Sequence, residues 1–221
     1  MTLNRKEPPV SAFTNRILHG DCIVALRSLP DSCVDFVLTD PPYLTNYRPR
    51  DGRRVGNDHD DGWLLPAFRE IHRVLKPDSL CLSFYGWPMV DRFMGAWKAC
   101  GFRPVSHLVW TKPYPSRDGY TQSFHEVAFL LAKGRPPKPT SPPPDVLPWE
   151  YTENRYHPTE KPVSGLVPLI MAFSAPGDLV LDPFAGSGST GLAARQCGRT
   201  FLLIEQEAGC YHTACQRLQS A

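Results

Sequence analysis

LVLDPFAGSGSTGLAA, at residues 179–194, is the stretch that decides the fold. It predicts a short buried strand, a tight glycine turn and the start of a helix. Gly186, Gly188 and Gly191 have the spacing GxGxxG, and Glu205 closes the next apolar run 23 residues after Asp182. This is the layout of a nucleotide-binding βαβ unit, in which glycines let the backbone approach a ligand and the acid binds ribose hydroxyls.

Asp182 helps to decide which nucleotide-like ligand binds, because it stands at the end of the strand, immediately before the glycine turn. A dinucleotide would place its pyrophosphate there, where backbone N–H groups and the helix N-terminus favour an anion. A carboxylate would repel that phosphate, whereas S-adenosylmethionine has no phosphate and carries cationic sulfonium and ammonium groups. The sequence therefore favours S-adenosylmethionine. A nicotinamide-dependent oxidoreductase is the alternative from another class, although no hydride-transfer site is evident in the sequence.

Apolar runs and helix-like segments alternate along the chain, which predicts a doubly wound α/β fold with a seven-stranded, mostly parallel sheet. The length suits a single domain over residues 1–221. The expected strands are Arg16–His19, Val34–Thr39, Ser79–Tyr85, His107–Trp110, Glu126–Ala132, Asp178–Leu181 and Thr200–Glu205. The expected helices are Cys22–Leu29, Leu64–Leu75, Trp87–Cys100, Val163–Ser174, Thr190–Cys197 and Cys210–Leu218.

The strand expected at Val34–Thr39 ends in the tetrad Asp40-Pro41-Pro42-Tyr43. Two prolines fix two φ angles, so the acid and the ring are held at the carboxyl end of the strand, where open α/β sheets bind ligands. An exocyclic amine of adenine or cytosine is a poor nucleophile, because its lone pair is delocalised into the ring. Asp40 and the Pro41 carbonyl can accept its two N–H bonds, and Tyr43 can stack on a base extruded from the duplex. The tetrad predicts methyl transfer to such an amine.

Together these motifs resemble the amino-group DNA methyltransferases, the N6-adenine and N4-cytosine family. DPPY resembles the family's catalytic motif and DPFAGSGST its cofactor loop, and the catalytic motif comes first, as in the β subgroup, a circular permutation of the common order. HPTEKP at residues 157–162 resembles that subgroup's additional cofactor motif. The resemblance implies a Rossmann-like methyltransferase fold, S-adenosylmethionine as donor with S-adenosylhomocysteine as product, and double-stranded DNA as substrate.

The resemblance also implies where the donor binds. The acid of Gly20-Asp21-Cys22 would lie near its adenine, Glu205 would bind the ribose, and residues of HPTEKP would line the methionine end. Trp110–Lys112 and His125-Glu126 resemble framework positions around the target-base pocket. The full expected set is Asp21, Cys22, His157, Thr159, Lys161, Asp182, Pro183, Phe184, Ala185, Gly186, Ser187, Gly188, Ser189, Thr190, Glu205 and Gln206.

The first tetrad residue bears on the target. An Asp there resembles the adenine enzymes more than the cytosine enzymes, so N6 of adenine is the expected target and N4 of cytosine the alternative. Related enzymes that methylate glutamine side chains or RNA bases have an Asn at that position. A binding module that keeps the cofactor fold without catalysis is a further alternative.

Two irregular segments, residues 44–62 and 134–156, are the expected DNA-contacting and target-recognition regions, since long irregular segments in a compact domain are often functional. The second is short and rich in proline, so one chain would offer little DNA-binding surface. A homodimer or higher homo-oligomer is therefore expected. The net charge is only +2, and the candidate DNA contacts are Arg48, Arg50, Arg53, Arg54, Lys133, Arg135 and Lys138.

The seven cysteines include no CxxC pair, which predicts reduced core thiols and no metal site. No apolar run approaches the roughly 20 residues that span a bilayer. The N-terminal stretch lacks the apolar core of a secretory signal. We therefore expect a cytoplasmic protein of bacterial or phage type with no membrane partner.

Overall fold

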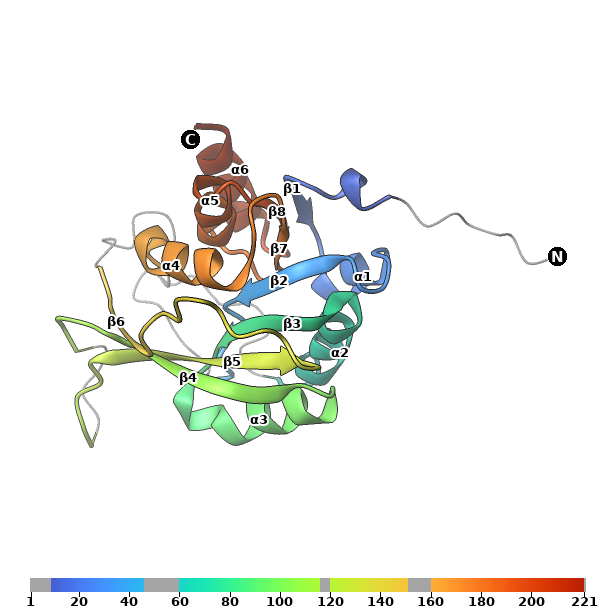
Figure 1. Cartoon of the computed structure of the whole chain (residues 1–221). Helices are drawn as coiled ribbons and strands as arrows, with labels where there is room; N and C mark the ends of the chain where they lie inside the picture. The colour runs from blue at the N-terminus through green and yellow to red at the C-terminus, as the bar shows by residue number, and fades with distance from the viewer. Residues whose placement is uncertain (1–8, 46–59, 116–119, 151–159, 221) are drawn as a thin grey trace.

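The computed structural model describes residues 9–45, 60–115, 120–150 and 160–220, and in this part of the chain a single sheet of eight strands forms the centre of the molecule (Figure 1). The strand order is β1-β8-β7-β2-β3-β5-β4-β6. Neighbours run parallel, except that β5 is antiparallel to β3 and β4. The strands are β1 (Arg16–His19), β2 (Val34–Thr39), β3 (Leu75–Phe84), β4 (Arg103–Thr111), β5 (His125–Lys133), β6 (Val146–Pro148), β7 (Leu179–Asp182) and β8 (Thr200–Glu205).

Helices cover both faces of this sheet, as expected for a doubly wound fold (Figure 1). Helices α1 (Cys22–Arg27), α2 (Leu64–Val74) and α3 (Val90–Ala99) cover one face, and α4 (Val163–Phe173), α5 (Ser189–Gln196) and α6 (Ala208–Ser220) cover the other. Two short 3-10 helices, η1 (Val10–Ala12) and η2 (Trp87–Met89), complete the described elements. None of the helices in the described ranges is long and apolar enough to cross a membrane.

Side chains of the central strand β2 alternate between the two cores. Val37 packs in the cluster that includes Phe68 and Trp97, whereas Phe36 and Leu38 pack in the cluster on the α4–α6 side. Because successive strand side chains point to opposite faces, a strand with apolar side chains on both faces must be buried on both. This burial explains why the Val34–Thr39 run predicted an interior parallel strand.

Strands β2 and β7 are neighbours in the sheet although they lie far apart in the sequence. Phe36 pairs with Val180 and Val37 with Leu181, in parallel. The carboxyl ends of the two strands therefore lie side by side at one edge of the sheet. The proline tetrad follows one of these ends and the glycine loop follows the other, so the fold brings the two motifs together.

The structure corrects the expected strands in two respects: their number and the start of β3. The segment 134–156 contains an eighth strand, β6, whose residues pair with Val109–Thr111 of β4. An edge strand tolerates Pro148 because its N–H side needs no partner. Strand β3 begins at Leu75 rather than Ser79: Leu75 pairs with Val34, and pairing then resumes between Leu80 and Phe36, so the Lys76-Pro77 turn forms a bulge inside the strand.

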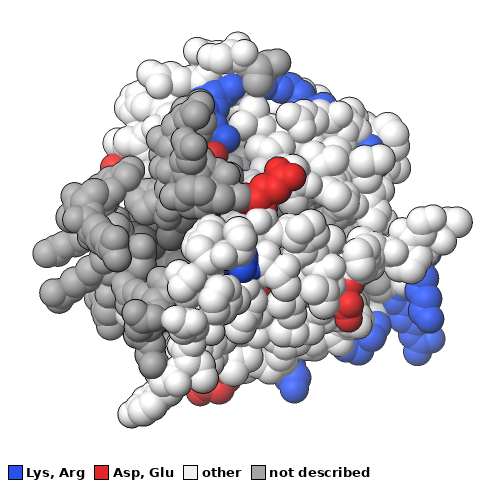
Figure 2. Space-filling view, turned by 90° about the vertical axis from the view of Figure 1, so that its left-hand side faces the viewer, with Lys and Arg blue, Asp and Glu red and all other residues white. Residues whose placement is uncertain are grey.

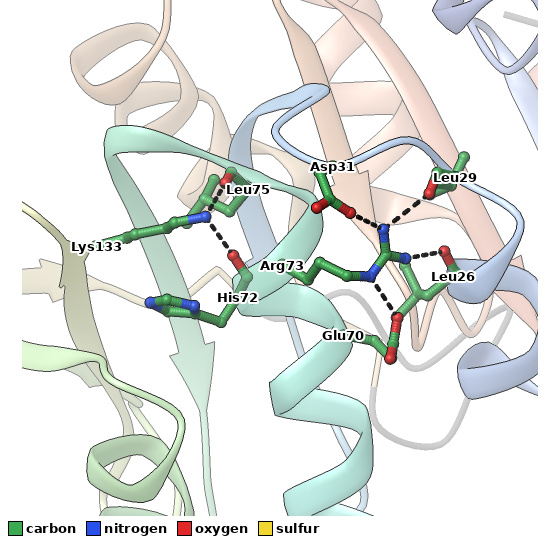
Figure 3. Close-up of polar contacts among 8 residues, drawn as sticks. All are labelled: Leu26, Leu29, Asp31, Glu70, His72, Arg73, Leu75 and Lys133. Carbon is green, nitrogen blue, oxygen red and sulfur yellow. Dashed lines mark hydrogen bonds and ion pairs between the residues drawn. The ribbon is translucent and has the colours of Figure 1, made fainter. Parts of the chain in front are cut away.

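Two cationic side chains cap helix ends at the opposite edge of the sheet (Figure 3). Arg73 donates hydrogen bonds to the carbonyl oxygens of Leu26 and Leu29 at the end of α1, at 2.8 and 2.9 Å. Lys133 Nζ donates to the carbonyl oxygens of His72 and Leu75, at 2.6 Å each. Cations at these positions satisfy orphan carbonyls and interact favourably with the helix dipole.

Candidate active site

A cavity of about 790 Å³ lies at the carboxyl ends of β2 and β7. Both predicted motifs line it, together with residues at the ends of β3, β4 and β6 and at the start of β5. The expected residues found in its lining are Asp21, Cys22, Asp40, Pro41, Pro42, Tyr43, Lys161, Asp182, Pro183, Phe184, Ala185, Gly186, Ser187, Ser189, Thr190, Glu205 and Gln206. The fold therefore unites five segments of sequence in one site.

In the tetrad, both carboxylate oxygens of Asp40 accept a hydrogen bond. The Tyr43 hydroxyl donates a hydrogen bond to Asp40 Oδ1 at 2.8 Å, and Lys161 Nζ donates to Oδ2 in an ion pair. Burial raises the pKa of Asp40 above its ordinary value, while the charge of Lys161 and the hydrogen bonds from Lys161 and Tyr43 oppose that rise. The same burial, with the negative charge of Asp40, raises the pKa of Tyr43, so the phenol stays protonated.

Gly86 lets the loop after β3 lie against the tetrad. A Cβ at position 86 would come within 2.8 Å of the Tyr43 Cβ and 3.0 Å of its carbonyl oxygen. Such contacts are too close for any other residue unless the backbone moves. The packing thus fixes where Tyr43 sits.

Two further ion pairs lie in or beside the cavity. Lys112 Nζ is 2.6 Å from Glu126 Oε1, and Arg217 Nη2 is 2.9 Å from Glu160 Oε1. Arg217 also donates to the carbonyl and hydroxyl oxygens of Ser187, at 2.8 Å each. Helix α6 therefore braces the glycine loop against the HPTEKP segment.

Glu205 supports the glycine loop from the end of β8. Its Oε2 accepts a hydrogen bond from the Gly186 N–H at 2.7 Å, and its Oε1 accepts one from the Glu207 N–H at 2.8 Å. Burial raises the pKa of Glu205, and the backbone hydrogen bonds oppose this rise. Asp21 caps α1 by accepting from the Val24 N–H at 3.0 Å.

The glycines of the loop have separate tasks. Gly186 lines the cavity with φ +52°, and space is open where a side chain would point. Gly188 and Gly191 face the protein instead, where a Cβ would meet Ala214 at 3.0 Å and Leu203 at 2.8 Å. Gly188 is absent from the cavity lining, so these two glycines serve the close packing of α5 against α6 and β8.

Comparison with known proteins places the chain in a family. A family model described as DNA methylase matches residues 34–216, from the start of β2 into α6. The chain belongs to this DNA methylase family. YubD of Escherichia coli (strain K12) is 53% identical over 94% of this chain and 91% of its own length. The DNA adenine methyltransferase YhdJ of the same strain is 30% identical over 86% of this chain and 77% of its own length.

Solved structures have the same fold as this DNA methylase. The cytosine-N4-specific PvuII DNA methyltransferase superposes with a TM-score of 0.77 at 22% identity, covering 92% of this chain and 86% of that one. M1.HpyAVI in complex with SAM gives 0.73 at 24% identity, covering 92% and 98%. The Rossmann-like methyltransferase fold expected from the sequence is thus confirmed.

Asp182 of the methylase has a different setting from the one its sequence position suggested. Its Oδ1 accepts hydrogen bonds from the Thr39 hydroxyl and the Phe184 N–H, at 3.0 and 3.1 Å, and its Oδ2 accepts from the Thr190 hydroxyl at 2.7 Å. Burial raises its pKa to about 7. The side chain joins β2, β7 and α5, so it is not a lone fixed charge facing the ligand.

The expected DNA contacts are not gathered at the cavity. Lys133 caps α2 at the opposite edge of the sheet, the Arg135 N–H donates to Asp78 Oδ1 at 2.6 Å, and Lys138 lines a separate cavity with Asp78. The start of segment 134–156 therefore lies away from the cavity, whereas its later residue Trp149 lines the cavity. Outside the described residues lie Arg48, Arg50, Arg53, Arg54, His157 and Thr159.

Sequence reasoning missed several residues of the methylase site. Arg217 has no motif around it, and only the fold brings α6 against the glycine loop. Glu160 is part of the HPTEKP motif, which was the available signal. Trp63, Trp87 and Trp149 also line the cavity, and nothing in the sequence indicated this because tryptophans are more often core residues.

Proposed function

We propose that this DNA methylase transfers a methyl group from S-adenosylmethionine to N6 of adenine in double-stranded DNA. The observation that carries the proposal is the shared cavity, in which Asp40 of the tetrad and Gly186 of the glycine loop lie together. Asp at the first tetrad position favours adenine. The 30% identity to the DNA adenine methyltransferase YhdJ supports the same choice.

The charge of the cavity fits a cationic donor. Its described lining contains seven acidic side chains, from Asp21 to Glu207, but only two lysines, Lys112 and Lys161, each in an ion pair. Excess negative charge disfavours a pyrophosphate and favours sulfonium and ammonium groups. The preference for a cationic donor, which the sequence analysis based on Asp182 alone, therefore has support from the acidic residues of the whole lining.

The residues that would hold the donor follow from their places in the lining. Glu205 would accept hydrogen bonds from the ribose hydroxyls, Asp21 would lie near the adenine, and Gly186 leaves room for close approach. When bound, S-adenosylmethionine supplies an electrophilic methyl group on a positively charged sulfur.

Asp40 and Pro41 would prepare the target amine. The Asp40 carboxylate and the Pro41 carbonyl would each accept one N–H of the amine, which draws the nitrogen towards tetrahedral geometry and localises its lone pair. Lys161 and Tyr43 hold the Asp40 carboxylate in place before the base arrives, and a preorganised acceptor of this kind needs little rearrangement during reaction. The methylated nitrogen then loses one proton, and the Asp40 carboxylate or water takes it. Tyr43 would stack on the extruded base.

Methylation of N4 of cytosine is the second candidate, since both bases present an amine beside a ring nitrogen. Incubation of purified protein with methyl-labelled S-adenosylmethionine and genomic DNA, followed by digestion to nucleosides and mass spectrometry, separates the two. We expect labelled N6-methyldeoxyadenosine. Label only in N4-methyldeoxycytidine would overturn the choice of base, and label in neither would overturn the function.

Asp40→Ala is the matched variant for this assay. Loss of one charge-assisted acceptor from a preorganised site should lower turnover roughly 100-fold or more, while donor binding persists. Near-parental turnover in this variant would remove Asp40 from the mechanism.

We also propose that the methylase acts as a homodimer or higher homo-oligomer in the cytoplasm, with segments 44–62 and 134–156 contributing to the DNA surface. Specific protein–DNA interfaces bury on the order of 1,000–2,500 Å², which is large for the two short segments of one chain. Most of the described surface on the face shown in Figure 2 is neither acidic nor basic. Sedimentation at micromolar concentration, with and without DNA, tests the assembly; a monomer active on a long specific site would overturn it.

A further inference from the structure

Asp40 and Lys161 form an ion pair that joins the tetrad directly to the HPTEKP segment. The family resemblance placed Lys161 at the methionine end of the methyl donor. In the structure its ammonium group binds Asp40 Oδ2 instead. This contact assigns Lys161 to the half of the cavity where the target base is expected.

The surroundings of Lys161 hold its ammonium group in place. The side chain is only 8% exposed, and its Nζ lies 4.9 Å from the centre of the Phe84 ring, 5.5 Å from that of Tyr43 and 5.9 Å from that of Trp149. Aromatic faces attract a cation, so these three rings favour the position of the ammonium group beside Asp40. The ammonium group next to Asp40 is therefore fixed by its surroundings.

The other groups that face Asp40 differ in charge from Lys161. Tyr43 is a neutral donor from the same loop, Glu126 of β5 is an acid, and Asp182 at the end of β7 is a second acid. Lys112 binds Glu126 and so offsets part of its charge. Lys161 is thus the cation in direct contact with a carboxylate that burial and two neighbouring acids would otherwise drive towards protonation.

We propose that Lys161 is a positioning residue for Asp40: it holds Oδ2, favours the carboxylate form of Asp40, and leaves Oδ1 to accept an N–H of the target amine. The inference rests on the proposed function and deepens it. The Tyr43 hydroxyl occupies Oδ1 in the absence of a base. As a neutral donor it is displaced more easily than the charged lysine, because charge-assisted hydrogen bonds are about twice as strong.

The pH profile of methyl transfer tests the proposal, measured at saturating S-adenosylmethionine on duplex DNA. In Lys161→Met the acid limb of kcat should move upward by roughly 1–3 pH units, since an adjacent opposite charge shifts a carboxyl by about that amount. Activity should recover as pH rises. Lys161→Arg keeps the charge and should keep the limb near its parental position. Reduced activity in Lys161→Met with an unmoved limb would overturn the proposal.

A matched control separates this effect from the simple loss of an ion pair. Lys76 pairs with Asp35 at the opposite edge of the sheet, so Lys76→Met removes a more exposed lysine–aspartate pair remote from the cavity and should leave the profile unchanged. If Lys161→Met does not fold, Lys161→Gln serves in its place. The same displacement of the limb in Lys76→Met would also overturn the proposal.

A second readout does not depend on turnover. Carbon-13 NMR of aspartate carboxyl groups, with the Asp40 signal assigned by its loss in Asp40→Asn, reports ionisation of Asp40 in the free enzyme. Its titration should lie at higher pH in Lys161→Met than in the parent, and equal midpoints would overturn the proposal. A parent that does not methylate DNA but shows the displaced titration would refute the proposed function and leave the Lys161–Asp40 relation standing.

Discussion

Replacing Arg217 with methionine should destabilise the methylase by about 3–5 kcal/mol, the usual effect of removing one partner from a buried ion pair. The side chains of Arg217 and Glu160 are only 10% and 5% exposed, so water cannot restore what the carboxylate loses. The variant also loses two hydrogen bonds at 2.8 Å to Ser187. Against a typical total stability of roughly 5–15 kcal/mol, this is a large fraction.

Urea unfolding of four proteins measures the effect: the parent, Arg217→Met, Glu160→Gln and the double variant. The double variant should recover about 2 kcal/mol or more relative to the sum of the single losses, since it leaves no uncompensated charge. Arg195→Met is the matched control, because exposed Arg195 donates a hydrogen bond to the Leu218 carbonyl at 2.6 Å without an ion pair. Additive single losses, or a loss in Arg217→Met no larger than in Arg195→Met, would refute the reasoning.

Three further predictions concern the donor, pH and DNA. Glu205→Ala should bind S-adenosylmethionine about tenfold to hundredfold more weakly by calorimetry, through lost charged hydrogen bonds; undiminished affinity would contradict the ribose placement. Because the pKa of Asp182 is raised to about 7, the folded protein holds a proton that the unfolded chain releases above about pH 4. Stability relative to Asp182→Asn should therefore fall between about pH 4 and pH 7 in urea unfolding, and a constant difference would argue against this. The third prediction concerns four clustered arginines, Arg48, Arg50, Arg53 and Arg54. Replacing all four with alanine should flatten the salt dependence of DNA binding and leave donor affinity unchanged. An unaltered slope would exclude them as phosphate contacts.

The fold was predictable where periodicity and sharp boundaries agree. The Val34–Thr39 run is apolar apart from Asp35 and Thr39 and is followed by Asp40 and two prolines, and the strand has those bounds. Prediction failed where tertiary pairing overrides local signals. The sequence places a helix end at Lys76-Pro77, yet Leu75 already pairs with β2. The short strand β6 forms because it can pair with the outer edge of β4.

The site was predictable as two motifs but not as a network of contacts. Glycine spacing and the tetrad identify which loops meet, since their strands are neighbours. The spacing cannot separate Gly186, which lines the cavity, from Gly188, which packs on α6. Nor can it pair Lys161 with Asp40, because such a partnership depends on how α4 is placed against the sheet.

The long separation of contacting residues makes the site a property of the complete chain. Asp40 and Lys161 lie 121 positions apart, and Thr39 and Asp182 lie 143 apart. Contacts of such separation close late, after the entropy of a long loop has been overcome. A chain divided within residues 135–145 would leave Asp40 on one fragment and Lys161 and Asp182 on the other. Methylation would then depend on reassembly of two polypeptides, which makes that segment a natural place to build a conditional enzyme.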